Sequence, residues 1–592
     1  MSQINNYPLV VDFENATFVV ETESGTRRLN FSQIATFFND IVNAGGIGEA
    51  KSTAAEALQA ALSANNTAND AVERIDDVIQ KNIATAYIQN RHLYIQLVDD
   101  TRVDCGIVIE GKEYGVCYDA STQSPTLERV GDAVGLHAGF AVGSDTNIVN
   151  DFDNIYPWSD IKRCTIANDG TITSYQGDAN YIEDGSIGQV MVEIPKFYIK
   201  RVTDESNQKV YTYIAGEQLS GYRLPEAFKD HNGDEMDYIY LAAYPSVNDG
   251  SNLTNSVATK QELNIKEEKY ANVMNYALNR GGGWHNFSAA EVCDVIIPLF
   301  IVEFATHNSS ALFPGNTTKT SVYCFADVES YGADKNEFTT SGVGDFGKTT
   351  PFAGKEFFVG MPVEVWLSPN QTDYTLAPMD RIEGEGEDAV TISIRNITHI
   401  TKDAETGKWT IAFDGAPILI DADFSINSVD FNGVCNNIKA SSGVVGDGEE
   451  GCVSFKWRGF ENLFNYDVVW LGGILYNKGD DGYIHYNPDL TQQNDTGYTE
   501  EPFVKTDISV PNATGYIKEM SNSEDYPFLW LPVELDGASD TAYCDKFTKI
   551  IITNPTRGIR WGDSGVFGFS SARVSDIVST ITACGRLAYC RF

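Results

Sequence analysis

The sequence predicts an α+β protein built of four parts in series: a small N-terminal anchoring segment, a trimeric coiled coil, a short β segment and a large mixed domain with a β-rich insertion. Three observations predict this order. Apolar residues recur about every 3.5 positions between residues 54 and 79, residues 84–115 alternate like strands, and the remaining chain mixes strand-like runs with two helical runs. A chain of 592 residues is long enough for several domains.

The composition excludes several classes of partner. The chain has 83 acidic and 42 basic residues and a formal net charge of −41. This balance argues against binding to nucleic acids or anionic lipid, since both require clustered Lys and Arg. The N-terminus has no basic start followed by an apolar run, and the longest apolar run, VIIPLFIV, contains a proline. We therefore expect no membrane insertion and no export by the common secretory route.

The coiled coil is predicted for residues 46–83, after an anchoring segment at residues 1–45. A helix with this narrow apolar stripe cannot bury it alone, and a polar Asn65 at the seam typically fixes register and oligomeric state. We expect a parallel homotrimer. The alternative is one amphipathic helix packed on its own chain. The expected trimer seam consists of Leu58, Ala61, Asn65, Ala68, Val72, Ile75 and Ile79.

The large domain is expected at residues 116–592, after a small β segment at residues 84–115. Its run VMVEIPKFYIKRV, at 190–202, alternates like one strand. Its run at 269–280 places apolar residues on one helical face and ends at three glycines. These patterns predict a core that combines strands with helices.

A second core helix is predicted from a capping box formed by Ser288 and Glu291, with a kink at Pro298. We expect Trp284 to pack at the turn between the two helices. An insertion at about 311–450 reads as a mostly β subdomain. Within it, the run AVTISIRNITHITKDAETGKWTIAFDG predicts a β-hairpin with its turn near AETGK.

Three sequence runs of the large domain resemble segments of one known fold. They are RGFENLFNYDVVWLGG, RWGDSGVFGFSS and ACGRLAY. The first resembles the Gly-Asn-Val-Trp-Glu-Trp region of formylglycine-generating-enzyme-type C-type-lectin folds. The other two resemble the closing segment of that fold, whose final Gly-Phe-Arg-like motif reads Gly585-Arg586-Leu587 here. The IPKFYIK strand, the Gly-Trp-His helix pair and the stretch at 114–133 resemble the versions in phage tail and tropism proteins. The resemblance covers about residues 115–592, with long insertions, and implies a C-type-lectin-like domain.

The resemblance implies that the last strand returns to pair beside early strands, with Leu587, Tyr589 and Phe592 facing inward. It also implies an exposed recognition surface before that strand, because aromatic anchors there alternate with adaptable polar residues. The alternative is that the two phenylalanines of this surface are core residues. The expected receptor-binding residues are Trp561, Asp563, Ser564, Phe567, Phe569, Ser571, Arg573, Ser575 and Asp576.

Enzyme chemistry is not expected. The enzymes of that family use two cysteines five positions apart, upstream of the final strand, whereas Cys584 and Cys590 lie six apart within it. Such spacing in a strand separates the side chains by about 20 Å, too far for a disulfide. The sequence has no HExxH, GxSxG or phosphate-loop motif, and no cofactor is expected. Asp- and Asn-rich runs at 151–160 and 477–489 could supply Ca²⁺ ligands, but ordinary solvated loops explain them better.

These features together predict a homotrimeric phage fibre protein, assembled in the host cytoplasm, whose N-terminal segment contacts other virion proteins. Its lectin-like domain is expected to bind a glycan or protein receptor on the bacterial surface, with weak sites multiplied by trivalency. Two other classes stay open. One is a structural head fibre or decoration protein without an essential receptor, and the other is a tail spike that degrades glycans.

Overall fold

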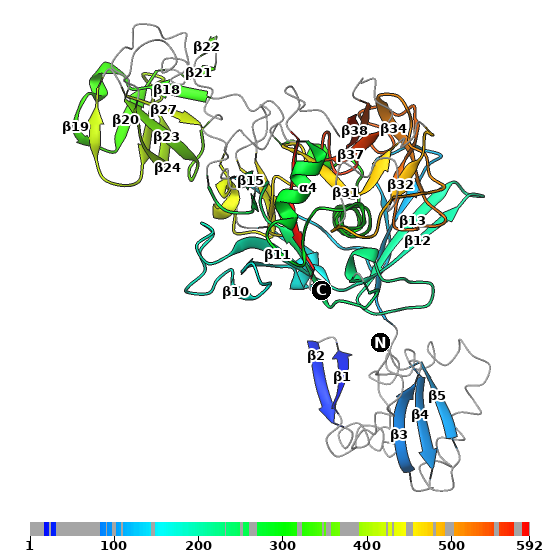
Figure 1. Ribbon diagram of the computed structural model, residues 1–592. Coiled ribbons are helices and arrows are strands. Elements are labelled where there is room, and N and C mark those ends of the chain that lie inside the picture. The colour runs from blue at the N-terminus through cyan, green and yellow to red at the C-terminus, as the bar shows by residue number, and fades with distance from the viewer. Residues whose placement is uncertain are drawn as a thin grey trace. The chain divides into compact units, whose positions relative to one another are not determined.

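In the computed structural model the chain forms two compact units, residues 1–111 and residues 112–592 (Figure 1). The fold is β-rich, with 41% of residues in strands and 13% in helices. The described residues are 17–22, 25–30, 83–89, 92–97, 102–107 and 111–590, the last range with gaps at 144–147, 231, 249–252, 260–268, 316–321, 342, 346–347, 351–356, 368–389, 422–423, 429–430, 446–453, 477–480, 492–502, 550–555 and 574–582.

The first unit contains two antiparallel β structures. One is the hairpin of β1 (Thr17–Thr22) and β2 (Gly25–Asn30). The other is a meander of β3 (Ile83–Gln89), β4 (His92–Leu97) and β5 (Arg102–Ile107), with β4 in the middle. The meander occupies the stretch for which the sequence predicts a β segment.

The predicted coiled coil lies outside the described residues for all of its seam positions. The homotrimer therefore stays a prediction. The seam positions concerned are Leu58, Ala61, Asn65, Ala68, Val72, Ile75 and Ile79.

The second unit is organised around a six-stranded sheet whose members come from distant parts of the chain. Strand β40, near the C-terminus, pairs antiparallel with both β14 and β17, so Tyr589 lies opposite Tyr240 on one side and Trp284 on the other. The predicted return of the last strand beside earlier strands is therefore confirmed. The strand order is β10 (Ile172–Tyr175), β9 (Lys162–Ile166), β11 (Gln189–Pro195), β14 (Tyr238–Ala242), β40 (Leu587–Tyr589) and β17 (Trp284–Asn286).

Leu587 and Tyr589 of β40 are buried, as expected, but Ala588 between them is buried as well, so the strand has no exposed face. Leu587 and Ala588 are both 0% exposed and Tyr589 is 5% exposed, because side chains cover both faces of the sheet at this strand. Phe592 lies outside the described residues. Since the two faces are equally buried, a period of two carries no information here.

The predicted single strand at 190–202 is also wrong. The run divides at Lys196 and Phe197 into β11 and a strand of a second sheet. Both halves are strand-like, so the sequence pattern continues across the break although the hydrogen-bonding partners change. The second sheet has the order β12 (Tyr198–Asp204), β13 (Lys209–Ala215), β6 (Glu113–Asp119) and β7 (Glu128–Gly131).

The predicted core helices are present. Helix α4 (Tyr270–Leu278) buries its apolar face, and the capping box of Ser288 and Glu291 is formed at the start of α5 (Ala289–Glu291). The kink takes another form than expected: a π-helical turn, Val292–Ile296, precedes α6 (Ile297–Phe304), and Pro298 lies in the first turn of α6. Proline fits there because the first turn needs no N–H donor from that position. Helix α7 (Ser309–Leu312) follows.

A nine-stranded sheet is built from strands that lie between Val468 and Cys584. It joins β31 to β37 and β38, and a short strand, β39, pairs parallel with β31. Its members in order are β33 (Val504–Lys505), β32 (Ile484–Tyr486), β31 (Val468–Tyr476), β37 (Arg557–Trp561), β38 (Phe569–Arg573), β36 (Lys546–Lys549), β34 (Gly515–Asn522) and β35 (Trp530–Leu535), with β39 (Ala583–Cys584) beside β31.

Two small sheets connect these parts. The parallel pair β8–β28 joins residues 141–142 to the region before the RGFENL run. The four-stranded sheet has the order β30 (Phe460–Glu461), β29 (Phe455–Trp457), β28 (Ser442–Val444) and β8 (Ala141–Val142), and a separate hairpin joins β15 (Val247–Asn248) to β16 (Thr254–Asn255).

The predicted insertion contains an eight-stranded sheet with a hydrophobic core of its own, built around Phe338, Phe413 and Phe424. The predicted hairpin is confirmed, since β24 and β25 pair antiparallel from Lys402 and Trp409. The strand order is β20 (Glu337–Thr340), β25 (Trp409–Phe413), β24 (Val390–Lys402), β23 (Pro362–Leu367), β27 (Phe424–Ser428), β18 (Val322–Phe325), β21 (Val343–Asp345) and β22 (Lys348–Thr350), and a separate pair joins β19 (Gly332–Lys335) to β26 (Ile418–Ile420).

The main core of the second unit is rich in large aromatic side chains. Each of them removes a large apolar area from water, which is the dominant favourable contribution to folding. Trp284, as expected, is buried next to the helices and packs on Tyr589, with ring centroids 5.0 Å apart. The fully buried tryptophans are Trp158, Trp284, Trp457, Trp470, Trp530 and Trp561.

Candidate functional site

The expected C-terminal recognition surface is largely buried, so the prediction of its exposure is wrong. Trp561, Phe567 and Phe569 are each 0% exposed, and Ser571 is buried in β38. The Trp561 indole N–H donates to the Val566 carbonyl at 2.7 Å, which satisfies it inside the core. The reason is that β37 and β38 are interior strands of the nine-stranded sheet. The alternative, in which both phenylalanines are core residues, is confirmed.

Two of the expected receptor-binding residues remain partly exposed. They are Asp563 and Ser564, in the turn between β37 and β38. The Ser564 hydroxyl accepts a hydrogen bond from a backbone amide of β36 and so fixes this turn. Arg573 ends β38, and its side chain lies outside the described residues, as do Ser575 and Asp576 entirely. What is described of the expected surface is thus a single small turn.

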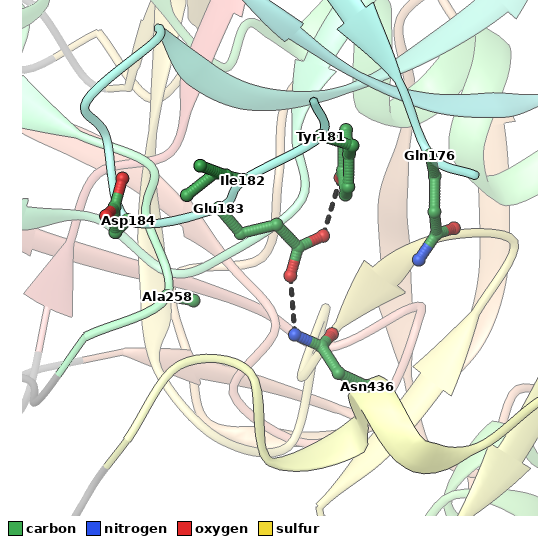
Figure 2. Close-up of a pocket in the computed structure, with 7 residues that line it drawn as sticks. All are labelled: Gln176, Tyr181, Ile182, Glu183, Asp184, Ala258 and Asn436. Carbon is green, nitrogen blue, oxygen red and sulfur yellow. Dashed lines mark hydrogen bonds between the residues drawn. The ribbon is translucent and has the colours of Figure 1, made fainter. Parts of the chain in front are cut away.

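The structure instead presents a cavity of about 370 Å³ formed by three separate segments. Most of its lining comes from the loop between β10 and β11, and the rest comes from the residues after β16 and from the 3₁₀ turn η8 (Val434–Asn437). We name it the Glu183 cavity. Its lining residues, shown in Figure 2, are Gln176, Tyr181, Ile182, Glu183, Asp184, Ala258 and Asn436.

The Glu183 carboxylate is the centre of a hydrogen-bond network. It accepts from the Tyr181 hydroxyl at 2.5 Å and from the Asn436 amide, as Figure 2 shows, and from the Tyr244 hydroxyl at 2.6 Å. The Arg163 guanidinium lies 3.0 Å away. Burial alone would raise the pKa of Glu183, but Arg163 and the hydroxyl donors outweigh it and hold the pKa below its usual range. The group is therefore a permanently charged acceptor at neutral pH.

Arg163, from β9, contacts lining residues of two separate segments, Glu183 and Asn436. It is 3% exposed, donates to the Gly459 backbone carbonyl at 2.8 Å and to the Asn436 side-chain Oδ1 at 2.6 Å, and stacks over the Tyr244 ring. A guanidinium that contacts four groups at once has little freedom to move. It fixes Glu183 and Asn436 relative to each other.

The backbone that carries Asn436 is fixed separately. The buried Glu461 carboxylate accepts one hydrogen bond from the Gly433 amide and one from the Cys435 amide, both at 2.8 Å. Gly433 has φ of +104°, a conformation that favours glycine. The lining of the cavity is thus formed before any ligand arrives, which lowers the entropic cost of binding.

The chemistry of the cavity suits recognition of a hydroxylated ligand. Carboxylate and amide groups form directed hydrogen bonds with hydroxyls, while Tyr181 and the 46% exposed Ile182 supply apolar contact. Asp184 accepts from the Ser186 amide at 2.8 Å, and hydrogen bonds from Ser186 lower the pKa of its carboxyl. Both carboxylates of the cavity thus stay ionised. Neither is suited to act as a general acid at neutral pH.

Sequence reasoning missed this site. Glu183 and Asn436 are 253 positions apart, and neither belongs to a motif of functional spacing. The one local signal was the polar run DANYIEDGS, which is also typical of an ordinary loop. Only the fold brings the two segments together.

The other predicted sites give a mixed result. Among the described residues, no three His, Cys, Asp or Glu side chains form a cluster that could hold a metal ion, and part of the 477–489 run lies outside them. The Cys590 thiol is free and lies near the Gly283 carbonyl, while the Cys584 side chain is outside the described residues. No helix in the described part of the chain is long and apolar enough to cross a membrane.

The sequence matches no family model, and no curated protein matches it either. The resemblance to phage tropism proteins therefore depends on the motifs of the sequence itself.

Proposed function

We propose that the chain is a phage virion fibre protein that binds a glycan on the bacterial surface without cleaving it. The observation that carries the proposal is the preformed Glu183 cavity, whose carboxylate is positioned by Tyr181, Asn436 and Arg163. A glycan presents many hydroxyl groups, and these can pair at little cost in ordering with Gln176, Asp184 and Asn436, the exposed polar groups of a lining that the Glu183 network holds in place.

The proposal includes a C-type-lectin-like fold for residues 112–592. Two features support it. Strand β40 lies between β14 and β17, and helix α4 packs on β17 of this sheet while α6 packs on β13 and β6 of the four-stranded sheet. An open cavity of modest polarity binds weakly by itself. The predicted trimeric coil would present three copies, and simultaneous engagement multiplies the affinity through effective concentration.

Binding is favoured over glycan cleavage because of the charge state of the cavity. Glycoside hydrolysis commonly needs one carboxylic acid whose pKa is raised, so that it can protonate the leaving oxygen. In the Glu183 cavity the pKa values of Glu183 and Asp184 are both lowered. Such a pair accepts hydrogen bonds and has no proton to give at neutral pH.

The test is binding of the purified full-length chain to intact bacteria and to immobilised capsule and cell-wall glycans. We expect Glu183→Gln to reduce binding at least tenfold, because it removes the charge that orders the cavity. Glu205→Gln is the matched control, since it makes the same change in the exposed turn between β12 and β13. Equal binding by all three proteins would show that the cavity is not the receptor site.

The same incubation separates the other classes of function. The length of the glycan polymer is measured before and after exposure to the protein. Shortened polymer would overturn the proposal in favour of a glycan-degrading spike. Absence of binding to every cell and glycan would favour a structural fibre or decoration protein.

A further inference from the structure

A second cavity, of about 260 Å³, shares Gln176 with the Glu183 cavity. Five of its eleven lining residues are Lys or Arg, and none is Asp or Glu. The whole chain, by contrast, has 83 acidic and 42 basic residues. We name it the basic cavity. Its five basic residues are Lys162, Arg163, Lys439, Lys456 and Arg458.

Two buried arginines form part of its wall. Arg163 is 3% exposed and Arg458 is 6% exposed. Their acidic partners do not line the cavity: these are Glu183 for Arg163, and Glu303 and Asp153 for Arg458. The Nη2 atom of Arg163 is buried and has no hydrogen-bond partner among the described residues. A buried guanidinium nitrogen without an acceptor is costly, so the site lacks one acceptor that a ligand could supply.

Three lysines add further positive charge. Lys162 and Lys439 are exposed at the rim, and Lys456 is buried with its Nζ bonded to the Ile438 carbonyl. Burial, together with the nearby Arg163 charge, lowers the pKa of Lys456 to about 8. The Lys456 and Arg163 charges thus lie close enough to disfavour each other, and the Glu461 and Glu183 carboxylates offset part of this crowding. An anion in the cavity would relieve this crowding.

We propose that the basic cavity binds an oxyanion, the carboxylate or phosphate group of an acidic glycan whose hydroxyl groups occupy the neighbouring Glu183 cavity. The inference rests on the glycan-binding function proposed above and names the class of glycan. Lys and Arg are the side chains that donate most strongly to such groups. The Arg163–Glu183 pair, at 3.0 Å, joins the two cavities, because Arg163 lines one and Glu183 lines the other.

A single ligand could thus contact a cavity lined by Lys and Arg and a neighbouring cavity lined by carboxylate and amide groups. Its anionic group meets the basic cavity, and its hydroxyl groups meet the exposed Gln176 amide and Asp184 carboxylate of the Glu183 cavity. Polymers that need a long positive surface fit poorly, because the net charge of −41 repels a nucleic-acid backbone outside this small region. A short, hydroxyl-rich anionic unit is the chemistry that both cavities accept.

The experiment is calorimetric titration of the full-length chain with four probes. They are an oligogalacturonate, a glycerol-phosphate oligomer, a neutral galactose oligomer of the same length, and inorganic phosphate. The variant Lys162→Ala/Lys439→Ala removes the rim charges without touching the core. The control Lys112→Ala/Lys229→Ala removes two charges from lysines that line neither cavity.

We expect one of the anionic oligomers to bind at least tenfold more tightly than the neutral one, with a salt dependence that weakens in the rim variant. Affinity for that oligomer should fall at least fivefold in the rim variant and stay within twofold in the control. Preference for galacturonate assigns a carboxylate, and preference for glycerol phosphate assigns a phosphate. Either result supports the oxyanion site.

Three outcomes would overturn the inference. The first is equal affinity for anionic and neutral oligomers, and the second is an equal loss of affinity in the rim variant and the control. The third is binding of inorganic phosphate alone, which would indicate an adventitious ion only. The variant Lys456→Met tests the buried part of the cavity. It should weaken binding of the anionic oligomer and leave binding of the neutral oligomer unchanged. If the neutral oligomer binds and the anions do not, the glycan-binding function stands and the oxyanion site fails. If no oligomer binds, both fail.

Discussion

Glu303 and Arg458 form a buried ion pair, with 2.7 Å between Oε1 and Nη2, that ties helix α6 to the turn between β29 and β30. Glu303 also accepts from the Trp457 indole at 2.9 Å and from the Asn150 amide at 2.7 Å. Glu303 is 0% exposed. Its charge is tolerated because all of its contacts are satisfied at once.

Removing the carboxylate should therefore be strongly destabilising. We expect Glu303→Ala to lower the free energy of unfolding by about 3–5 kcal/mol, because it removes the buried partner of Arg458 and leaves that guanidinium only its contact with the partly exposed Asp153 carboxylate. Urea titration followed by circular dichroism measures the change. Glu329→Ala, which breaks the exposed contact with Lys408, is the control and should leave the midpoint nearly unchanged. Equal shifts in the two variants would contradict the argument.

Arg560 should behave in the opposite way. It is 0% exposed, and none of its three guanidinium nitrogens has a hydrogen-bond partner among the described residues. Burial lowers its pKa to about 10, although the Asp563 charge opposes this. We expect Arg560→Met to raise the unfolding free energy by about 1–3 kcal/mol, since it removes an uncompensated buried charge. Thermal unfolding checks the sign, and a fall in the midpoint would indicate an anionic partner for Arg560.

His307 makes stability depend on pH on the acid side. Its Nδ1 hydrogen-bonds to the Ala542 carbonyl at 3.1 Å, its ring stacks on Tyr543, and burial lowers its pKa to about 3. Between about pH 6.5 and pH 3 the unfolded histidine binds a proton that the folded one does not. Stability should fall by about 1.4 kcal/mol per pH unit through this window as pH decreases.

The comparison that isolates this effect uses His307→Phe. Unfolding free energies are measured at several pH values between 7 and 3.5 for both proteins. Because the carboxylates titrate in both, the difference in slope belongs to His307. Parallel curves would mean that His307 is protonated in the folded protein.

Gly170 should tolerate no side chain. It has φ of +82°, and a Cβ atom there would lie 1.7 Å from the Tyr589 hydroxyl oxygen of β40. Gly177 also has positive φ, at +105°, but a Cβ there would meet nothing within 4 Å. Both substitutions to Ala carry backbone strain, and only Gly170→Ala adds a clash. We expect Gly170→Ala to be the more destabilising by more than 1 kcal/mol in denaturant titrations. Equal effects would show that Tyr589 moves away at no cost.

The sequence predicted best where one local pattern determines the structure. Helix α4, the capping box of Ser288 and Glu291, and the β24–β25 hairpin each depend on residues close together in the chain. The break between β11 and β12 could not be seen, because strand-like residues continue through Lys196 and Phe197. Neighbouring strands, and not the segment itself, decide to which sheet each half belongs.

The candidate site was less predictable for the same reason. Aromatic residues mixed with Ser and Asp are typical both of a recognition loop and of interior strands, and Trp561 and Phe569 proved to be interior. Glu183 stood in a polar run typical of any loop, and its partners Arg163, Tyr244 and Asn436 come from separate parts of the chain. The cavity forms only when segments far apart in the sequence come together, so no short stretch of sequence predicts it.

The position of β40 has a consequence for synthesis. Strands β14 and β17 do not pair with each other. Both pair with residues 587–589, which the ribosome adds some three hundred positions later. Until then each presents an open edge, and open edges are templates for wrong pairing between chains. Folding should be slow, because closing such long loops costs entropy before the favourable contacts between the strands form. A nascent chain of this kind stays exposed to such wrong pairing until residues 587–589 have been synthesised.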